Sequence, residues 1–246
     1  MALTRPWASA AIVAVLAAGL ASSGTDAKGE IPMTVYVTSP HDVMPLDMQE
    51  LWKMNAPLLE GAHVEYRNEH AITRDVKEIS ALLEQETGIH GAWDAFQNLR
   101  PGAFRADMWR TMMLWAKGGL YLDCDLELQV PITTWIKHSN STLLLVRDCE
   151  NFKGKNGLAW AYWNAMIAAT PRHKILEHAL RTMVHNVQTH YYAEELPAFR
   201  PLAITGPRAL AAALETYNGS IKEMSQAAQL VVAKNEDGLD DPIVQL

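Results

Sequence analysis

Hydrophobic residues along the chain follow two spacings, one typical of strands and one typical of helices. Alternating or β-branched runs predict strands, whereas apolar residues that recur every three or four positions predict helices. The expected strands cover residues 33–38, 63–66, 120–128 and 142–146. The expected helices cover residues 47–54, 75–86, 104–117, 158–169, 173–190 and 207–217, with a helical turn at 134–137. This alternation predicts an α/β fold in which helices flank a central, mostly parallel sheet.

The stretch over residues 104–128 carries the candidate chemistry. Its apolar residues recur at helical spacing up to Trp115, and Gly118-Gly119 is typical of a helix end. Asp107 and Arg110 are three residues apart and therefore share one face of this helix, away from the apolar face. A strand is expected to follow directly.

The expected strand runs through an acidic pair, Asp123 and Asp125. Residues two apart in a strand point to the same side, so both carboxylates face one cleft while Cys124 faces the opposite layer. Two such carboxylates favour a hard divalent cation, Mn²⁺ or Mg²⁺, which neutralises charge on a leaving diphosphate. The pair also fits a solvated strand end, and Asp107 with Arg110 also fits a surface ion pair, so the residues alone leave the function open.

The run FRADMWRTMMLWAKGGLYLDCDLEL, residues 104–128, contains Asp-x-x-Arg on a helix, then Gly-Gly, an aromatic residue and Asp-x-Asp. In order and spacing it resembles the glycosyltransferases with a DXD-containing sugar-binding region. That group includes Golgi initiating α-1,6-mannosyltransferases, inositol-phosphoceramide mannosyltransferases and α-1,4-galactosyltransferases. Shorter similarities extend the resemblance from residue 31 to about residue 217: Ile31-Pro32, Trp163 to Ala169 with Pro171 and His173, and Ile204-Thr205-Gly206-Pro207.

The resemblance implies a GT-A-like single domain that transfers a hexose, mannose or galactose, with retention and with a divalent metal. The donor would be a nucleotide-sugar, GDP-mannose or a UDP-hexose, and the acceptor a glycan or glycolipid. Asp125 would be the direct ligand of Mn²⁺ or Mg²⁺, and Asp123 would contact the ribose or share the metal. The other implied contacts are Asp107 and Arg110 on the donor hexose, Arg110 also near the diphosphate, Arg105 as a second donor contact, Tyr121 on the substrate, and Asn164 and Asp148 on the acceptor side.

One part of the first strand departs from the family pattern. Many relatives carry a His-Gln-x-Trp sequence that contacts the base, whereas this chain has Tyr36 to Pro40 there. The choice between UDP and GDP therefore stays open.

The first 30 residues differ from the rest. An apolar run from Trp7 to Ala21 follows Arg5, which is typical of a signal peptide or a short signal anchor. Residues 31–246 are then the transferase domain. This leader and two sequons, at Asn140 and Asn218, favour the secretory pathway, with the Golgi lumen implied by the resemblance and membrane association possible through the leader.

The composition sets outer limits on the function. A net charge of −7 argues against a general nucleic-acid binder, because such proteins need clustered Lys and Arg. Two cysteines, Cys124 and Cys149, exclude a disulfide scaffold and leave one bridge or two thiols as alternatives.

Two other functions compete with transfer. A metal-dependent phosphoester hydrolase predicts further carboxylates or histidines near Asp125. A catalytically degenerate sugar-nucleotide-binding protein predicts binding without turnover.

Overall fold

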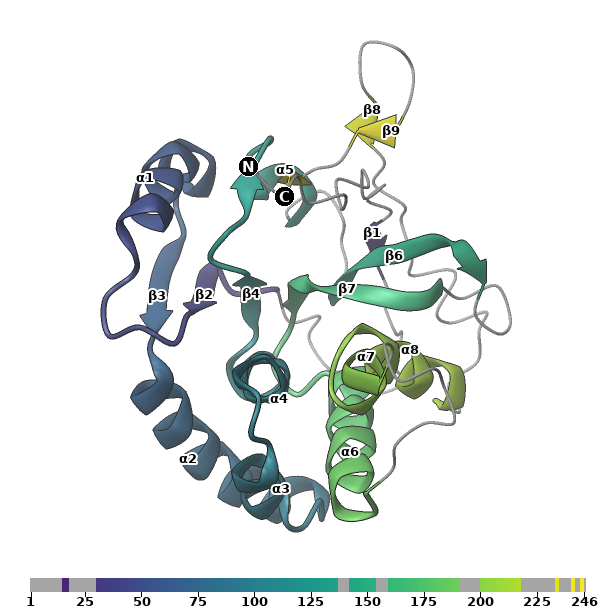
Figure 1. Ribbon diagram of the computed structural model, residues 1–246. Helices are drawn as coiled ribbons and strands as arrows, with labels where there is room; N and C mark the ends of the chain where they lie inside the picture. The colour runs from purple at the N-terminus through teal and green to yellow at the C-terminus, as the bar shows by residue number, and fades with distance from the viewer. Residues whose placement is uncertain are drawn as a thin grey trace, which may run out of the picture.

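The computed structural model describes residues 15–17, 30–136, 142–153, 159–190 and 200–217, together with 233–234, 240–241 and 244–245 (Figure 1). The strands are β1 (Val15–Ala17), β2 (Thr34–Thr38), β3 (His63–Arg67), β4 (Gly119–Leu122), β5 (Glu127–Leu128), β6 (Leu143–Lys153), β7 (Ala159–Ala169), β8 (Ala233–Lys234), β9 (Asp240–Asp241) and β10 (Val244–Gln245). The helices are α1 (Leu46–Asn55), the 3₁₀ helix η1 (Ala56–Leu59), α2 (Glu69–Thr87), α3 (Ala92–Asn98), α4 (Gly102–Lys117), α5 (Ile132–Ile136), α6 (Lys174–Gln188), α7 (Arg200–Ile204) and α8 (Pro207–Thr216).

One mixed sheet organises the fold, with strand order β1-β6-β7-β4-β2-β3. Strand β2 pairs in parallel with β3 and with β4, whereas β7 is antiparallel to both β4 and β6. Strand β6 therefore runs in the same direction as β2, β3 and β4. This confirms the predicted α/β fold, with most of the central strands running one way.

Helices cover both faces of the sheet (Figure 1). The larger helices α2, α4, α6 and α8 gather on one face, and α1 and α5 lie on the other. Successive strand residues point into the two layers in turn: Tyr36 and Tyr121 join the core on the α4 side, and Val35 and Leu120 join the core on the α1 side. The sheet is thus buried on both sides, as its apolar strands require.

The predicted helix over residues 158–169 is wrong, because this segment forms strand β7. Its residues alternate between the layers, with Met166 and Ala168 in one core and Ile167 and Ala169 in the other. Strand pairing with β4 and β6 on both sides outweighs the helical preference of this alanine-rich run.

The connection between α4 and β4 is tight and depends on two glycines. Gly118 has a φ of 66° and Gly119 a φ of 106°. A Cβ on Gly118 would lie 2.6 Å from Pro171 Cδ, and one on Gly119 would lie 2.6 Å from the Thr34 carbonyl oxygen. The chain therefore turns directly from the buried helix into the centre of the sheet, which places the end of β4 beside α4.

Within the described ranges, no helix has the length and apolar character needed to cross a membrane. Apart from β1, the predicted leader lies outside the described residues, as do Asn140 and Asn218.

Candidate functional site

Arg110 lies at the centre of the candidate site. Its Nη1 donates to Asp123 Oδ1 at 3.1 Å and to the Asn164 carbonyl oxygen at 2.6 Å. Its Nη2 lies 3.2 Å from Asp107 Oδ1, and the guanidinium carbon lies 4.2 Å from the centre of the Tyr121 ring. Burial opposes the charge, but Tyr121, Asp123 and Asp107 together raise the pKa of Arg110. Arg110 is therefore a permanent, fixed cation.

Asp107 is buried on α4, behind Arg110. Its Oδ1 accepts a hydrogen bond from Asn164 Nδ2 at 2.7 Å, and its Oδ2 accepts one from Thr205 Oγ1 at 3.1 Å. Burial raises the pKa of Asp107, while Arg110 and Thr205 act to lower it. Donors from α4, from β7 and from the α7–α8 connection thus converge on one carboxylate.

Tyr121 and Asp123 come from β4 and from the residue after it. The Tyr121 hydroxyl donates to Asp123 Oδ1 at 2.5 Å, and burial raises the pKa of this hydroxyl, so it stays protonated. Asp123 Oδ2 makes no hydrogen bond to any described residue, and the Asp123 side chain is 33% exposed. One oxygen of Asp123 is held by the protein, and the other faces outward.

The acidic pair lies in a turn and not in a strand, which corrects the expected geometry. Strand β4 ends at Leu122, and residues 123–126 turn before β5 begins at Glu127. Cys124 is a free thiol that packs against the core on the α1 side and also lines the pocket beside Asp123. The Asp125 side chain reaches solvent, but the neighbouring chain removes part of the water around its carboxylate, and this desolvation together with the negative charge of Asp123 raises the pKa of Asp125.

These two carboxylates fit a hard divalent cation. Asp123 Oδ2 and both oxygens of Asp125 are free of hydrogen bonds to the described side chains, and oxygen is the ligand atom that Mn²⁺ and Mg²⁺ prefer. The described residues contain no cluster of three or more His, Cys, Asp and Glu side chains able to hold a metal.

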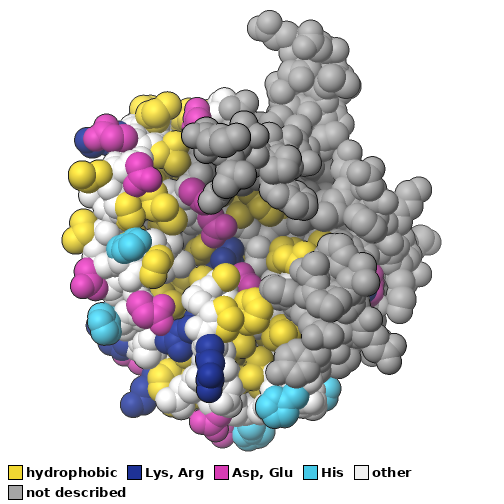
Figure 2. Space-filling model, in the orientation of Figure 1, with side chains coloured by type: hydrophobic (Ala, Val, Ile, Leu, Met, Phe, Trp, Pro, Cys, Tyr) yellow, Lys and Arg dark blue, Asp and Glu magenta, His cyan; other side chains and the backbone are white. Residues whose placement is uncertain are grey.

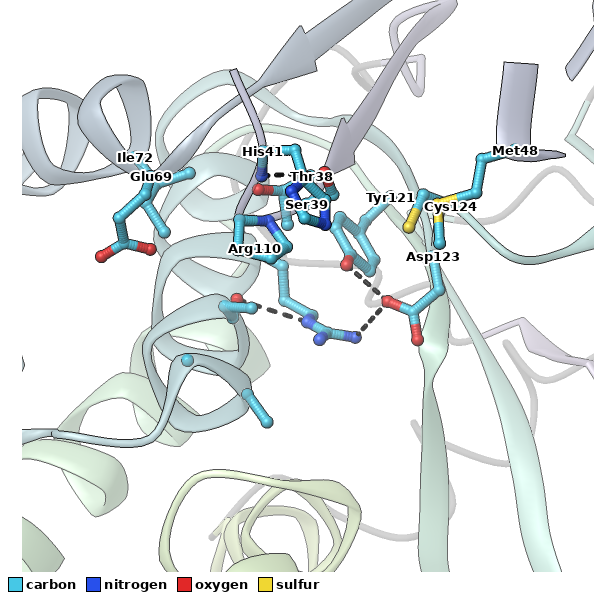
Figure 3. A pocket seen from close by; sticks show the side chains of 14 residues that line it. Thr38, Ser39, His41, Met48, Glu69, Ile72, Arg110, Tyr121, Asp123 and Cys124 are labelled. Carbon is cyan, nitrogen blue, oxygen red and sulfur yellow. Dashed lines mark hydrogen bonds and ion pairs between the residues drawn. The ribbon is translucent and has the colours of Figure 1, made fainter. Parts of the chain in front are cut away.

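A pocket of about 380 Å³ opens in front of Arg110 and Asp123 (Figure 3). Figure 3 shows Arg110 and Asp123 directed toward each other, with Tyr121 between the strand and the guanidinium. The lining residues come from the ends of β2 and β4, from α1 and α2, and from the first turns of α4: Thr38, Ser39, Pro40, His41, Met48, Glu69, Ile72, Gly102, Ala103, Ala106, Arg110, Tyr121, Asp123 and Cys124. The volume is within the usual range for small-molecule sites.

The structure brings three of the predicted site residues to the pocket wall, namely Arg110, Tyr121 and Asp123. Asp107 and Asn164 form the layer behind them, because the Asn164 amide is directed to Asp107. Asp125 is beside the pocket on the turn. The side chain of Asp148 lies outside the described residues.

Arg105, predicted as a second donor contact, lies on the side of α4 that meets α2. Its Nη2 lies 2.7 Å from Glu69 Oε1 and donates to Thr73 Oγ1 at 3.0 Å, and its guanidinium carbon lies 4.1 Å from the centre of the Phe96 ring. It connects α4 to α2 and is not a lining residue. Glu69, which Arg105 contacts, does line the pocket.

Sequence reasoning missed several residues that support the site. Thr205 lies within the quoted Ile204 to Pro207 similarity, which was a usable signal, although its contact with Asp107 was not predictable. Trp52 and Asn55 of α1 donate to backbone oxygens of the acidic turn, at Cys124 and Leu126. For Asn55, the available signal in the sequence was a polar amide directly after the expected helix 47–54.

The surface around the site is mixed in charge. On the face seen in Figure 2, acidic and basic side chains are interspersed with hydrophobic ones. Among the histidines, His41 lines the pocket, whereas His173 is buried and caps α6. Burial lowers the pKa of His173 to about 4, so it is neutral at ordinary pH.

This geometry can be compared with that of known proteins. Residues 35–142 match the family model of the glycosyltransferase sugar-binding region containing a DXD motif. The matched segment carries Arg105, Asp107, Arg110, Tyr121, Asp123 and Asp125, whereas Asn164 and Thr205 lie beyond it. No curated protein matches the chain.

Two solved structures are similar to this chain. The PaToxG glycosyltransferase has 16% sequence identity and a TM-score of 0.49, with 80% of this chain and 75% of that chain covered. The UDP-bound glycosyltransferase domain from the YGT toxin has 11% identity and a TM-score of 0.35, with 74% of this chain and 56% of that chain covered.

Proposed function

We propose that this protein is a metal-dependent, retaining glycosyltransferase that moves a hexose from a nucleotide-sugar to a glycan or glycolipid. The observation that carries the proposal is the pairing of Arg110 with Asp123 on the wall of one pocket, inside the segment that matches the DXD family model. A fixed cation beside a carboxylate with one free oxygen suits a sugar-linked diphosphate.

In this proposal Asp125 and the free Oδ2 of Asp123 hold Mn²⁺ or Mg²⁺. When bound, the metal supplies positive charge that stabilises the leaving nucleotide diphosphate. The described residues contain no group of three acidic, histidine or cysteine side chains placed to hold a metal, so in this proposal oxygens of the donor diphosphate complete the coordination. Metal and donor would then bind together.

The chain's own groups orient the donor. Arg110 cannot swing away, because Asp107, Asp123 and the Asn164 carbonyl oxygen hold its guanidinium and the Tyr121 ring lies against it. A cation held in this way loses little entropy when it binds an anion, and it needs no rearrangement during the reaction. We assign Arg110 to the diphosphate and the donor hexose, and Asp107 and Asn164 to the layer that fixes it.

The finer assignments rest on the family resemblance. They are mannose or galactose as the hexose, GDP-mannose or a UDP-hexose as the donor, retention of configuration, and a Golgi lumenal location with the leader as signal peptide or anchor. A panel of UDP- and GDP-sugars identifies the donor and the hexose, and NMR of the anomeric configuration of the product tests retention.

The central experiment measures Mn²⁺-dependent nucleotide release from that panel. We expect one donor to be hydrolysed or transferred by the wild type. We expect Asp125→Ala to lower the rate by roughly 100-fold or more, since metal stabilisation of the transition state is worth several kcal/mol. Glu127→Ala is the matched control, because Glu127 is an acidic residue two positions along that lies in strand β5 and accepts a hydrogen bond from Gln129. Equal activity of the Asp125 variant and the control would reject the assignment.

The same assay separates the alternatives. A degenerate binder would take up Mn²⁺ and nucleotide but release none from any donor. A hydrolase would cleave simple phosphoesters at a rate comparable with that of a nucleotide-sugar.

A further inference from the structure

One face of α1 is directed at the acidic turn. Met48, Trp52 and Asn55 are spaced by four and three residues, so they lie along one side of the helix. Met48 lines the pocket, and Trp52 and Asn55 contact the chain beyond β4. This part of α1 therefore follows the turn from the pocket to β5.

The contacts are hydrogen bonds to the backbone on both sides of Asp125. Trp52 Nε1 donates to the carbonyl oxygen of Cys124 at 2.8 Å. Asn55 Nδ2 donates to the carbonyl oxygen of Leu126 at 2.7 Å, and Asn55 Oδ1 accepts from the Leu128 amide at 2.8 Å. Asn55 is only 1% exposed, so its two bonds form away from water, where an unpaired group is costly.

Apart from these bonds, the turn is held by the buried Leu126 side chain and by few backbone hydrogen bonds among the described residues. The Leu126 amide approaches the Asp123 carbonyl oxygen at 3.4 Å, which is long for a hydrogen bond. The Asp123 amide donates to the Ala165 carbonyl oxygen at 2.8 Å, so Asp123 is held by β7. Asp125 is exposed, and its carboxylate makes no hydrogen bond to another described side chain; the donor beside it is its own backbone amide.

We propose that Trp52 and Asn55 are positioning residues that aim the Asp125 carboxylate at the metal of the proposed reaction. The inference rests on the proposed function. Since no other described side chain bonds to the Asp125 carboxylate, its direction follows from the backbone of residues 124–126, and α1 holds the carbonyl oxygens on both sides of Asp125. Asp123 is oriented separately, by β7, Tyr121 and Arg110.

Two variants test this in the full chain. Trp52→Phe keeps an aromatic ring in place and removes the donor to Cys124, and Asn55→Ser removes the reach to Leu126 and Leu128. Met54→Ala is the matched control, because Met54 is on the same helix and 61% exposed. Mn²⁺ affinity is measured by electron paramagnetic resonance with GDP or UDP present, and hydrogen exchange of residues 123–128 is measured without ligand.

We expect Mn²⁺ to bind about 2- to 10-fold more weakly to Trp52→Phe than to the control, as the loss of one hydrogen bond implies. Excess Mn²⁺ should restore turnover, and exchange over residues 123–128 should rise in both variants. A purely structural role would lower the melting temperature and leave Mn²⁺ affinity unchanged. Unchanged Mn²⁺ affinity would overturn the inference whether or not exchange rises, even where wild-type activity supports the proposed function.

The two proposals fail in different ways. If the wild type binds no Mn²⁺ with either nucleotide, the proposed function is wrong, and the positioning of Asp125 toward a metal falls with it. If the wild type binds Mn²⁺ and the variants match the control, the function stands and only the role of α1 is rejected.

Discussion

Thr205→Val tests the buried layer behind the site. Thr205 is fully buried, and its hydroxyl donates to Asp107 Oδ2 at 3.1 Å. Valine keeps the shape and removes this donor to a carboxylate, which is worth about 1.5–3 kcal/mol. For a chain of this size we expect the melting temperature to fall by roughly 3 to 12 °C at neutral pH.

The loss should depend on pH in a defined direction. Burial raises the pKa of Asp107 above its ordinary 3.8, so the folded state favours the protonated acid and becomes more stable as the pH falls through this raised pKa. Removing the Thr205 donor raises the pKa of Asp107 further. The difference in the free energy of unfolding between variant and wild type is therefore largest at neutral pH. It shrinks as the pH falls toward the ordinary Asp pKa of 3.8.

Thermal unfolding at several pH values, followed by circular dichroism, measures both effects. Thr205→Ser is the control, since it keeps the hydroxyl and loses one methyl group, at about 1 kcal/mol. An equal loss in the Val and Ser variants, with no pH dependence, would refute a role for the hydroxyl.

Three further changes give separate expectations. Tyr121→Phe removes the hydrogen bond to Asp123 but keeps the ring, and should weaken binding of Mn²⁺ with nucleotide about 5- to 10-fold in calorimetry; unchanged binding would contradict a role for the hydroxyl. Gly118→Ala should cost about 2 kcal/mol or more in urea unfolding, because of its φ of 66° and the nearby Pro171, whereas a neutral effect would show that the turn can relax. Burial lowers the pKa of His173 from 6.5 to about 4. The free energy of unfolding should therefore fall by roughly 3 kcal/mol as the pH drops through this interval, because the unfolded state takes up the proton first. His173→Asn should flatten that profile while keeping an acceptor for the helix cap, and an unchanged slope would assign it to other groups.

Local sequence patterns predicted those elements in which helix or strand propensity agrees with the spacing of the buried apolar residues. The strand at Thr34–Thr38 and the helix at Gly102–Lys117 were expected within a few residues, and Gly118 ends its helix as predicted. Helix α2 begins at Glu69, six residues before the expected start, although Asn68 is a typical N-cap and accepts from Ala71. Strand β7 was not predictable in this way, because its conformation depends on strands that flank it on both sides.

The residues of the candidate site also fall into two groups, those that a local sequence pattern predicted and those that it did not. Asp107 and Arg110 lie on one helix and Asp123 directly follows the next strand, and the family resemblance of this run implied that all three act on one donor. Trp52 and Thr205 reach the site across 72 and 98 residues of sequence, and no local pattern encodes such contacts. The turn at Asp125 also escaped prediction, since an apolar run on both sides resembled one continuous strand.

The glycine connection between α4 and β4 limits how related chains can vary in length. Arg110 and Asp123 are 13 residues apart and meet across a turn that has no space for a side chain on Gly118. An insertion or deletion anywhere in that interval would rotate the helix or shift the strand register and separate the two charges. Other chains with this pocket should therefore keep the arginine 13 positions before the first aspartate, with Gly-Gly ending four positions before that aspartate. This spacing is a stricter criterion for recognising them than the Asp-x-Asp pair itself.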